Sequence, residues 1–274
     1  MENYSVLMSV YYKEQPEFLR LSIESMFSQS VPTDDFVLMC DGPLTEELDA
    51  VIAALQCKYG SVLHVVRAEV NRGLSYALND GLTFCKNDLV ARMDSDDIAP
   101  SNRCELQLQK FAEDPQLKIV GGAINEFEGT PSNIVSHKDM PQSCDDILRY
   151  AKKRNPFNHP TVMYRKSAVL AARGYPHFAL HEDYALWAKL LAAGAKGCNL
   201  SQTLCNMRVD NGLYHRRGGL NYFKTAVKFR YHLYRSGFYS LWNFLYVTSA
   251  LAVVCLIPQS VRKATYLKVL RRGK

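Results

Sequence analysis

The feature that most constrains the fold is a regular alternation of apolar runs and amphipathic segments in the first hundred residues. Short apolar runs predict buried strands, and they occupy residues 6–10, 36–40, 62–66 and 89–93. The segments between them carry apolar residues at helical spacing and predict helices at residues 16–27, 45–55 and 74–84. Strands that alternate with helices in this way predict an α/β fold with a mostly parallel, doubly wound sheet.

The second half of the chain is less regular. A helix is expected at residues 101–111, followed by an irregular region up to about residue 141. Four residues in that region break any long element, namely Gly121, Gly122, Gly129 and Pro131. Three further elements are expected, a short strand at 160–164 and helices at 167–172 and 182–193.

Length and cysteine usage fit a folded intracellular protein. The 274 residues suit one large domain with an appendage. The eight cysteines are scattered without a C-x-x-C pair, which favours reduced thiols in the cytoplasm over disulfides or a zinc site. The first residues lack a basic start and a cleavage site, so no secretory signal is expected.

Charge is distributed unevenly along the chain. Of its 33 Lys and Arg residues, 12 follow residue 210, whereas none of its 27 Asp and Glu residues do. A basic segment behind an acidic body predicts an anionic partner for that segment alone. The acidic body would repel nucleic-acid phosphates, so an anionic membrane surface is the preferred partner and nucleic acid is not expected.

An uncharged apolar segment lies within the basic region, at residues 238–257. Its 20 residues are long enough to span a bilayer. Polar residues inside it and basic residues on both flanks favour a helix that lies on the cytoplasmic leaflet. The alternative is a core helix that packs on the main domain.

The sequence Asp94-Ser95-Asp96 follows a predicted buried strand. If strand geometry continues, both carboxylates point the same way, so that one cation contacts both. Mg²⁺ and Mn²⁺ are commonly held by one or two carboxylates together with substrate phosphates. Asp41 and Asn71 also follow predicted strands, and in doubly wound sheets ligands bind where such loops converge.

Together these motifs resemble the family 2 glycosyltransferases. Asp41-Gly42, Asn71-Arg72-Gly73, Asp94-Ser95-Asp96-Asp97 and Glu182-Asp183 occur in that family's order, over roughly residues 4–220. The run at 208–219 resembles bacterial enzymes that build exopolysaccharide, capsule or O-antigen repeat units. The resemblance implies a GT-A fold over 1–220, with a nucleotide-sugar-binding half at 1–100 and an acceptor-side half at 101–220. Residues 221–274 would then form a basic, apolar, helical membrane-associating segment.

The resemblance also implies roles for individual residues. Asp183 would be the general base that deprotonates the acceptor hydroxyl, and Glu182 would orient acceptor or base. Asp96 would bind the metal directly, with Asp94 contacting ribose or the metal's water shell and His215 as a further candidate ligand. The remaining donor-binding candidates are Tyr11, Tyr12, Glu14, Asp41, Asn71, Arg72, Ser95, Arg208, Arg216 and Arg217.

The implied reaction is inverting transfer of a hexose (glucose, galactose or an N-acetylated form) from a UDP-sugar to a sugar hydroxyl, assisted by Mn²⁺ or Mg²⁺. The implied acceptor is a lipid-linked oligosaccharide in surface polysaccharide synthesis. Such an enzyme would be cytoplasmic, and peripheral or monotopic at the inner face of the plasma membrane.

Other functions are less consistent with the sequence. A polyprenyl-phosphate sugar synthase remains an alternative, although such enzymes usually lack the long segment at 121–154. A nucleotidyltransferase should carry a glycine-rich basic loop after its first strand, which residues 10–14 lack. A glycoside hydrolase would also use two carboxylates but has no need of a nucleotide pocket.

Overall fold

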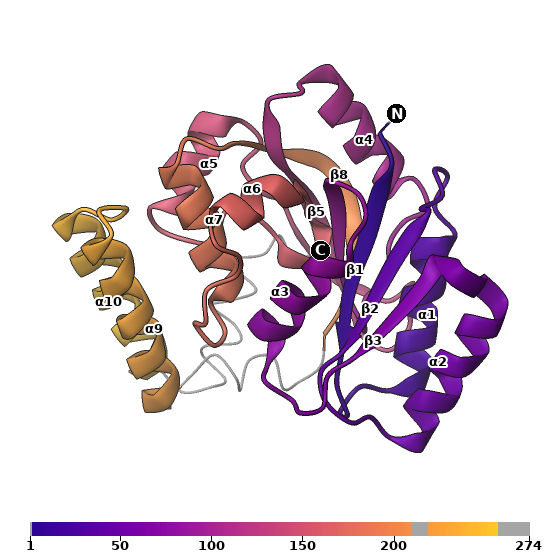
Figure 1. The fold of residues 1–274 in the computed structure, drawn as a ribbon. Coiled ribbons are helices and arrows are strands. Elements are labelled where there is room, and N and C mark those ends of the chain that lie inside the picture. Colours follow the sequence, from indigo (N-terminus) through magenta and orange to yellow (C-terminus); the bar gives the residue numbers. More distant parts are fainter. Residues whose placement is uncertain (1, 210–218, 257–274) are drawn as a thin grey trace.

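The computed structural model describes residues 2–209 and 219–256, which form one mixed sheet with helices on both faces (Figure 1). The strands follow the order β3-β2-β1-β4-β7-β5-β6, and β8 pairs with β5. The strands are β1 Tyr4–Val10, β2 Asp35–Cys40, β3 Leu63–Arg67, β4 Leu89–Asp94, β5 Leu117–Phe127, β6 Ile134–Lys138, β7 Met163–Arg165 and β8 Lys196–Arg208. The first four strands are parallel, as predicted, whereas β7 is antiparallel to both β4 and β5.

The helices cover the sheet as two layers. The α-helices are α1 Pro16–Phe27, α2 Glu46–Tyr59, α3 Leu74–Phe84, α4 Arg103–Glu113, α5 Cys144–Ala151, α6 Lys166–Ala171, α7 Glu182–Ala192, α9 Gly219–Arg235 and α10 Leu241–Leu256. Short 3₁₀ turns lie at Gly60–Val62 and His159–Thr161. One face carries α1, α2 and α4, and the other carries α3, α5, α6 and α7.

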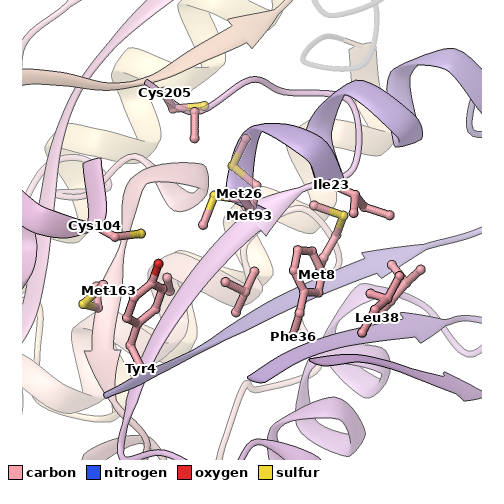
Figure 2. Packing of buried hydrophobic residues seen from close by; sticks show 14 of the residues in the cluster. Tyr4, Met8, Ile23, Met26, Phe36, Leu38, Met93, Cys104, Met163 and Cys205 are labelled. Carbon is pink, nitrogen blue, oxygen red and sulfur yellow. The ribbon is translucent and has the colours of Figure 1, made fainter. Parts of the chain in front are cut away.

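The core forms because alternate residues of the central strands point to opposite faces. Met8 and Leu38 pack with Ile23 and Met26 of α1 on one face (Figure 2). On the other face, Leu7 and Val37 pack with residues of α3 and α7. The sheet is thus buried on both sides, which leaves the loops at the ends of its strands as the place for a binding site.

The expectation of an irregular region up to residue 141 was wrong. Residues Leu117–Phe127 form the eleven-residue strand β5, which runs through Gly121 and Gly122 and pairs with β8 over most of its length. A Cβ at Gly122 would lie 2.6 Å from Leu204 Cδ1, and one at Gly121 would lie 2.4 Å from Asn199 Oδ1. These glycines therefore admit a close neighbouring strand and do not end the element.

Within the apolar segment at 238–257, residues Leu241–Leu256 form α10, which packs on α9. In turn, α9 packs on α7, because Phe229 and Leu233 share a buried cluster with Tyr184 and Ala188. The inner side of α10 is therefore packed on the protein, as the alternative of a core helix predicts, because Val247 lies in this same buried cluster. Among the residues that the structure describes, no helix is both long and apolar enough to cross a bilayer.

Candidate active site

The predicted donor-side residues gather at the carboxyl ends of the parallel strands. Tyr11 follows β1, Asp41 follows β2, and Asp94 is the last residue of β4. Because β1 pairs with both β2 and β4, these three strand ends lie at one edge of the sheet. Tyr11 and Tyr12 are 42% and 50% exposed there, so their rings are accessible to a ligand.

Asp41 connects the loop after β2 to the loop after β3. Its two carboxylate oxygens accept hydrogen bonds from the backbone N–H groups of Arg72 and Gly73, each at 2.9 Å. Gly42 has a φ of +86°, and a Cβ there would lie 2.6 Å from Asn71 N. Asp41 thus holds the Asn71-Arg72-Gly73 loop in place. Its predicted contact with a nucleotide base stays a prediction.

The side chain of Arg72 turns toward α3. Its guanidinium pairs with Asp80 and lies 5.2 Å from the ring centre of Tyr76. It also lines an open cavity of about 470 Å³ between β3 and α3, together with Val66 and Phe84. The predicted contact between Arg72 and a nucleotide stays a prediction.

A cluster of acidic side chains occupies the end of β4. Ser95 Oγ donates a hydrogen bond to Glu14 Oε2, which joins the loop after β1 to the Asp94-Ser95-Asp96 turn. Burial raises the pKa of Asp96 to about 7, and the charges of Asp94 and Glu14 contribute to the rise. Crowded carboxylates of this kind favour binding of a cation, because a cation relieves their mutual repulsion.

These side chains fit a hard divalent cation that is shared with a phosphate. The side chain of Asp94 is 36% exposed, so the carboxylate is accessible from the loop edge. Within residues 2–209 and 219–256, no cluster of three His, Cys, Asp or Glu residues could hold a metal ion by itself. Two carboxylates plus a substrate diphosphate is the arrangement that Mg²⁺ and Mn²⁺ commonly adopt. The candidate ligand His215 and the candidates Arg216 and Arg217 lie outside the described residues.

Asp97 and Arg208 connect the end of β8 to the acidic turn by hydrogen bonds. Asp97 is 1% exposed and accepts a hydrogen bond from Arg208 N at 2.8 Å. The guanidinium of Arg208 donates to the backbone oxygens of Asp96 and Gly129 and lies 3.7 Å from the ring centre of Phe18. Arg208 thus lies beside the acidic turn, and its predicted contact with the donor stays a prediction. The bonds it makes there are to the protein backbone.

Arg92 is a site residue that sequence reasoning missed. It is 1% exposed, and its Nη2 donates to Asp94 Oδ1. Its Nε and Nη1 atoms have no hydrogen-bond partner within the part of the chain that the structure describes. The available signal was an arginine inside the otherwise apolar run Leu89-Val90-Ala91-Arg92-Met93. Arg92 therefore forms an ion pair with Asp94 at the end of the strand.

The second acidic pair begins α7, as predicted. Asp183 Oδ2 accepts a hydrogen bond from Asn155 Nδ2 at 2.6 Å, and Asp183 Oδ1 accepts one from Tyr184 N at 2.7 Å. Burial raises the pKa of Glu182 to about 7, Asp183 adds to the rise, and Arg92 opposes it. Arg92 likewise opposes the rise in the pKa of Asp96. The positive charge of Arg92 thus acts on a carboxylate of each acidic cluster.

The raised pKa of Glu182 predicts a pH-dependent stability. Its folded-state pKa of about 7 lies above the ordinary 4.5, so its ionisation opposes folding. That penalty is absent below about pH 4.5 and complete above about pH 7, so it lowers stability as the pH rises between them. We expect Glu182→Gln to raise the unfolding free energy at pH 8 by on the order of 1–3 kcal/mol. Urea unfolding at pH 8 and pH 5 checks this, and a variant less stable than wild type at pH 8 contradicts it.

The parallel sheet, the loops at its carboxyl edge and the paired carboxylates after β4 define a GT-A glycosyltransferase. The chain belongs to glycosyl transferase family 2, whose model matches residues 5–173. The match covers the donor-side motifs and ends before Glu182. The chain is therefore an enzyme of the glycosyltransferase class.

Two bacterial glycosyltransferases are similar over most of the chain. The UDP-Gal:alpha-D-GlcNAc-diphosphoundecaprenol beta-1,3-galactosyltransferase of Escherichia coli is 39% identical over 98% of this chain and 97% of its own length. The amylovoran biosynthesis glycosyltransferase AmsE of Erwinia amylovora is 37% identical over 82% of this chain and 83% of its own length.

Solved structures confirm the fold at low sequence identity. The mannosyltransferase PcManGT of Pyrobaculum calidifontis, in complex with GDP-Man and Mn²⁺, has a TM-score of 0.66 at 16% identity. That likeness covers 96% of this chain and 79% of that one. TarS 1-349 of S. aureus, in complex with UDP, has a TM-score of 0.60 at 14% identity, over 97% and 72% of the two chains.

Proposed function

We propose that this enzyme transfers a hexose from a UDP-sugar, with inversion, to a hydroxyl of a sugar carried on a lipid diphosphate. The observation that carries the proposal is that there are two acidic clusters, one after β4 and one at the start of α7, and that the buried Arg92 pairs with Asp94 and acts electrostatically on Glu182. The likeness to the Escherichia coli galactosyltransferase makes galactose the first hexose to test and surface polysaccharide synthesis the expected setting.

The donor would lie across the carboxyl edge of β1, β2 and β4. The exposed rings of Tyr11 and Tyr12 would bind the nucleoside, in the half of the domain formed by residues 1–100. Asp94 and Asp96 would hold Mn²⁺ or Mg²⁺ against the diphosphate, and this cation would neutralise the charge of the leaving group. The hydrogen bond from Arg92 Nη2 to Asp94 Oδ1 would hold the Asp94 carboxylate in place.

The acceptor would approach from the half formed by residues 101–220. Asp183 takes the proton from the acceptor hydroxyl, while the hydroxyl oxygen attacks the anomeric carbon opposite the diphosphate. The bond from that carbon to the diphosphate oxygen breaks with its electron pair, so the configuration at the anomeric carbon inverts. Glu182, at the same helix end, would orient the acceptor or the base.

The test is a transfer assay with a panel of donors and two acceptors. The donors are UDP-galactose, UDP-glucose, UDP-N-acetylglucosamine and GDP-mannose, each with Mn²⁺, and the main acceptor is an N-acetylglucosamine diphospholipid. We expect one UDP-hexose to be transferred at least ~10-fold faster than the others, because binding pockets discriminate epimers through a few hydrogen bonds. Transfer to polyprenyl phosphate alone would instead identify a polyprenyl-phosphate sugar synthase.

We also propose that α10 binds the cytoplasmic face of an anionic membrane. Its outer side is an apolar stripe at helical spacing, and Trp242 within it is 82% exposed. The stripe comprises Leu241, Trp242, Leu245, Tyr246 and Val253. The adjacent helix α9 carries exposed basic residues, Lys224, Lys228 and Arg235. Apolar insertion next to basic side chains is the pattern of interfacial helices, and it would bring α7 to a lipid-linked acceptor.

Vesicle flotation tests this second proposal. The triple variant Trp242→Ser, Leu245→Ser, Tyr246→Ser should lose most of its binding to phosphatidylglycerol vesicles, because apolar burial contributes to insertion. The matched control is Leu148→Ser with Leu170→Ser, which alters exposed leucines of α5 and α6 and should bind as wild type does. A wild-type protein that does not float with these vesicles would contradict the proposal.

A further inference from the structure

We propose that Asn155 is a positioning residue that sets the orientation of the Asp183 carboxylate. This inference rests on the proposed role of Asp183 as general base. The amide Nδ2 of Asn155 donates to Asp183 Oδ2 at 2.6 Å, from the loop between α5 and β7. The backbone N–H of Tyr184 donates to Asp183 Oδ1 at 2.7 Å. One donor on each oxygen fixes the plane of the carboxylate.

The orientation of the Asn155 amide is itself determined by the loop. Its Oδ1 accepts a hydrogen bond from Phe157 N at 3.3 Å, so its Nδ2 must face Asp183. The two ends of an amide group are chemically distinct, and only the nitrogen can donate. The Nδ2 donor to Asp183 Oδ2 therefore has a fixed position.

The loop that carries Asn155 is anchored on the sheet. Asn158, which is 4% exposed, donates through Nδ2 to Gly122 O at 2.9 Å. The buried Thr161 accepts a hydrogen bond from Gly122 N at 3.1 Å. Gln107 of α4 donates to Thr161 O at 2.9 Å. These bonds fix the loop of Asn155 on β5 and α4. Asp183 is therefore held in place by a residue that does not belong to α7.

Such support matters because a general base must lie within hydrogen-bond reach of the proton it removes. A displacement of about 1 Å at a catalytic group lowers rates by as much as ~100-fold. Asn155 is suited to this task because it is uncharged. It donates a hydrogen bond to the base but does not give it a proton.

The test compares Asn155→Asp and Asn155→Ala with wild type. The aspartate variant has nearly the same shape and still accepts from Phe157 N, but it cannot donate to Asp183 when ionised. We expect both variants to lower kcat by ~10- to 100-fold, with the Kd for UDP and Mn²⁺ within about twofold of wild type. The matched control is Asn87→Asp, which removes a similar bond from Asn87 Nδ2 to Asp34 Oδ1 at 2.9 Å, and should leave kcat unchanged.

Combining each change with Asp183→Asn separates this inference from the proposed function. If Asn155 acts through Asp183, Asn155→Ala should cause little further loss in the Asp183→Asn background, because coupled residues are not additive. If Asp183→Asn abolishes transfer while the Asn155 variants retain wild-type kcat, the positioning role is wrong and the proposed function stands. Retained transfer in Asp183→Asn overturns both. A fall in UDP affinity that matches the fall in kcat indicates a merely structural role and overturns the inference.

Discussion

Asp183→Asn is expected to lower kcat for sugar transfer by about 10³-fold, within the 10²–10⁴-fold range of general acid–base catalysis. Asparagine keeps the size of the side chain but cannot accept the acceptor's proton. In the proposed mechanism the donor lies next to Asp94 and Asp96 and does not contact Asp183, so its affinity should change by less than about twofold. Steady-state kinetics and titration of UDP with Mn²⁺ measure the two quantities separately.

The matched control for this prediction is Asp145→Asn. Asp145 is likewise an acidic residue in the first turn of a helix, α5, but it is exposed. Its substitution should leave kcat and donor affinity unchanged. A kcat in Asp183→Asn within threefold of wild type would show that the proton leaves by another route.

Asp96→Ala is expected to abolish the part of UDP binding that depends on Mn²⁺. Removal of one of the two carboxylates proposed to share the cation should weaken binding by at least ~100-fold, or about 2.8 kcal/mol. The variant should fold normally, because Asp96 ionises unfavourably in its buried position with its pKa raised to about 7. Calorimetric titration of UDP with and without Mn²⁺ gives the difference directly.

A control for Asp96→Ala is Glu113→Ala at the exposed end of α4, which should bind UDP and Mn²⁺ as wild type does. Binding of UDP that is equally tight with and without the metal, in wild type and in Asp96→Ala, would contradict the assignment. The same titration with GDP, CMP and dTDP identifies which nucleotide the site prefers.

The first half of the fold could be predicted from the sequence because its strands are buried on both faces. Such strands are continuous apolar runs, and β1, β2 and β4 were predicted to within one or two residues at each end. β5 and β8 could not be found this way. β5 contains two glycines, which are explained only by the close approach of β8 in the folded protein. β8 itself is mostly polar, so it is not an apolar run. The relation between these strands is a tertiary property that local pattern does not contain.

In the candidate site, too, some residues could be predicted from local sequence and others could not. Residues that follow a buried strand, such as Asp41 and Asp94, were identified because strand ends converge in a parallel sheet. Arg92 and Asn155 act through other residues, and their partners Asp94 and Asp183 become apparent only in three dimensions. Asp41 and Arg208 were expected to bind nucleotide, which stays a prediction. In the structure, both form hydrogen bonds to the backbone of neighbouring loops.

The configuration of the newly formed glycosidic bond tests the central claim most directly. With a UDP-α-hexose, a single displacement assisted by Asp183 inverts the anomeric carbon, so the product should be entirely β-linked. The coupling constant of the anomeric proton in the NMR spectrum of the purified product distinguishes the two configurations for galactose and glucose. An α-linked product would contradict direct displacement and the assignment of Asp183 as the base.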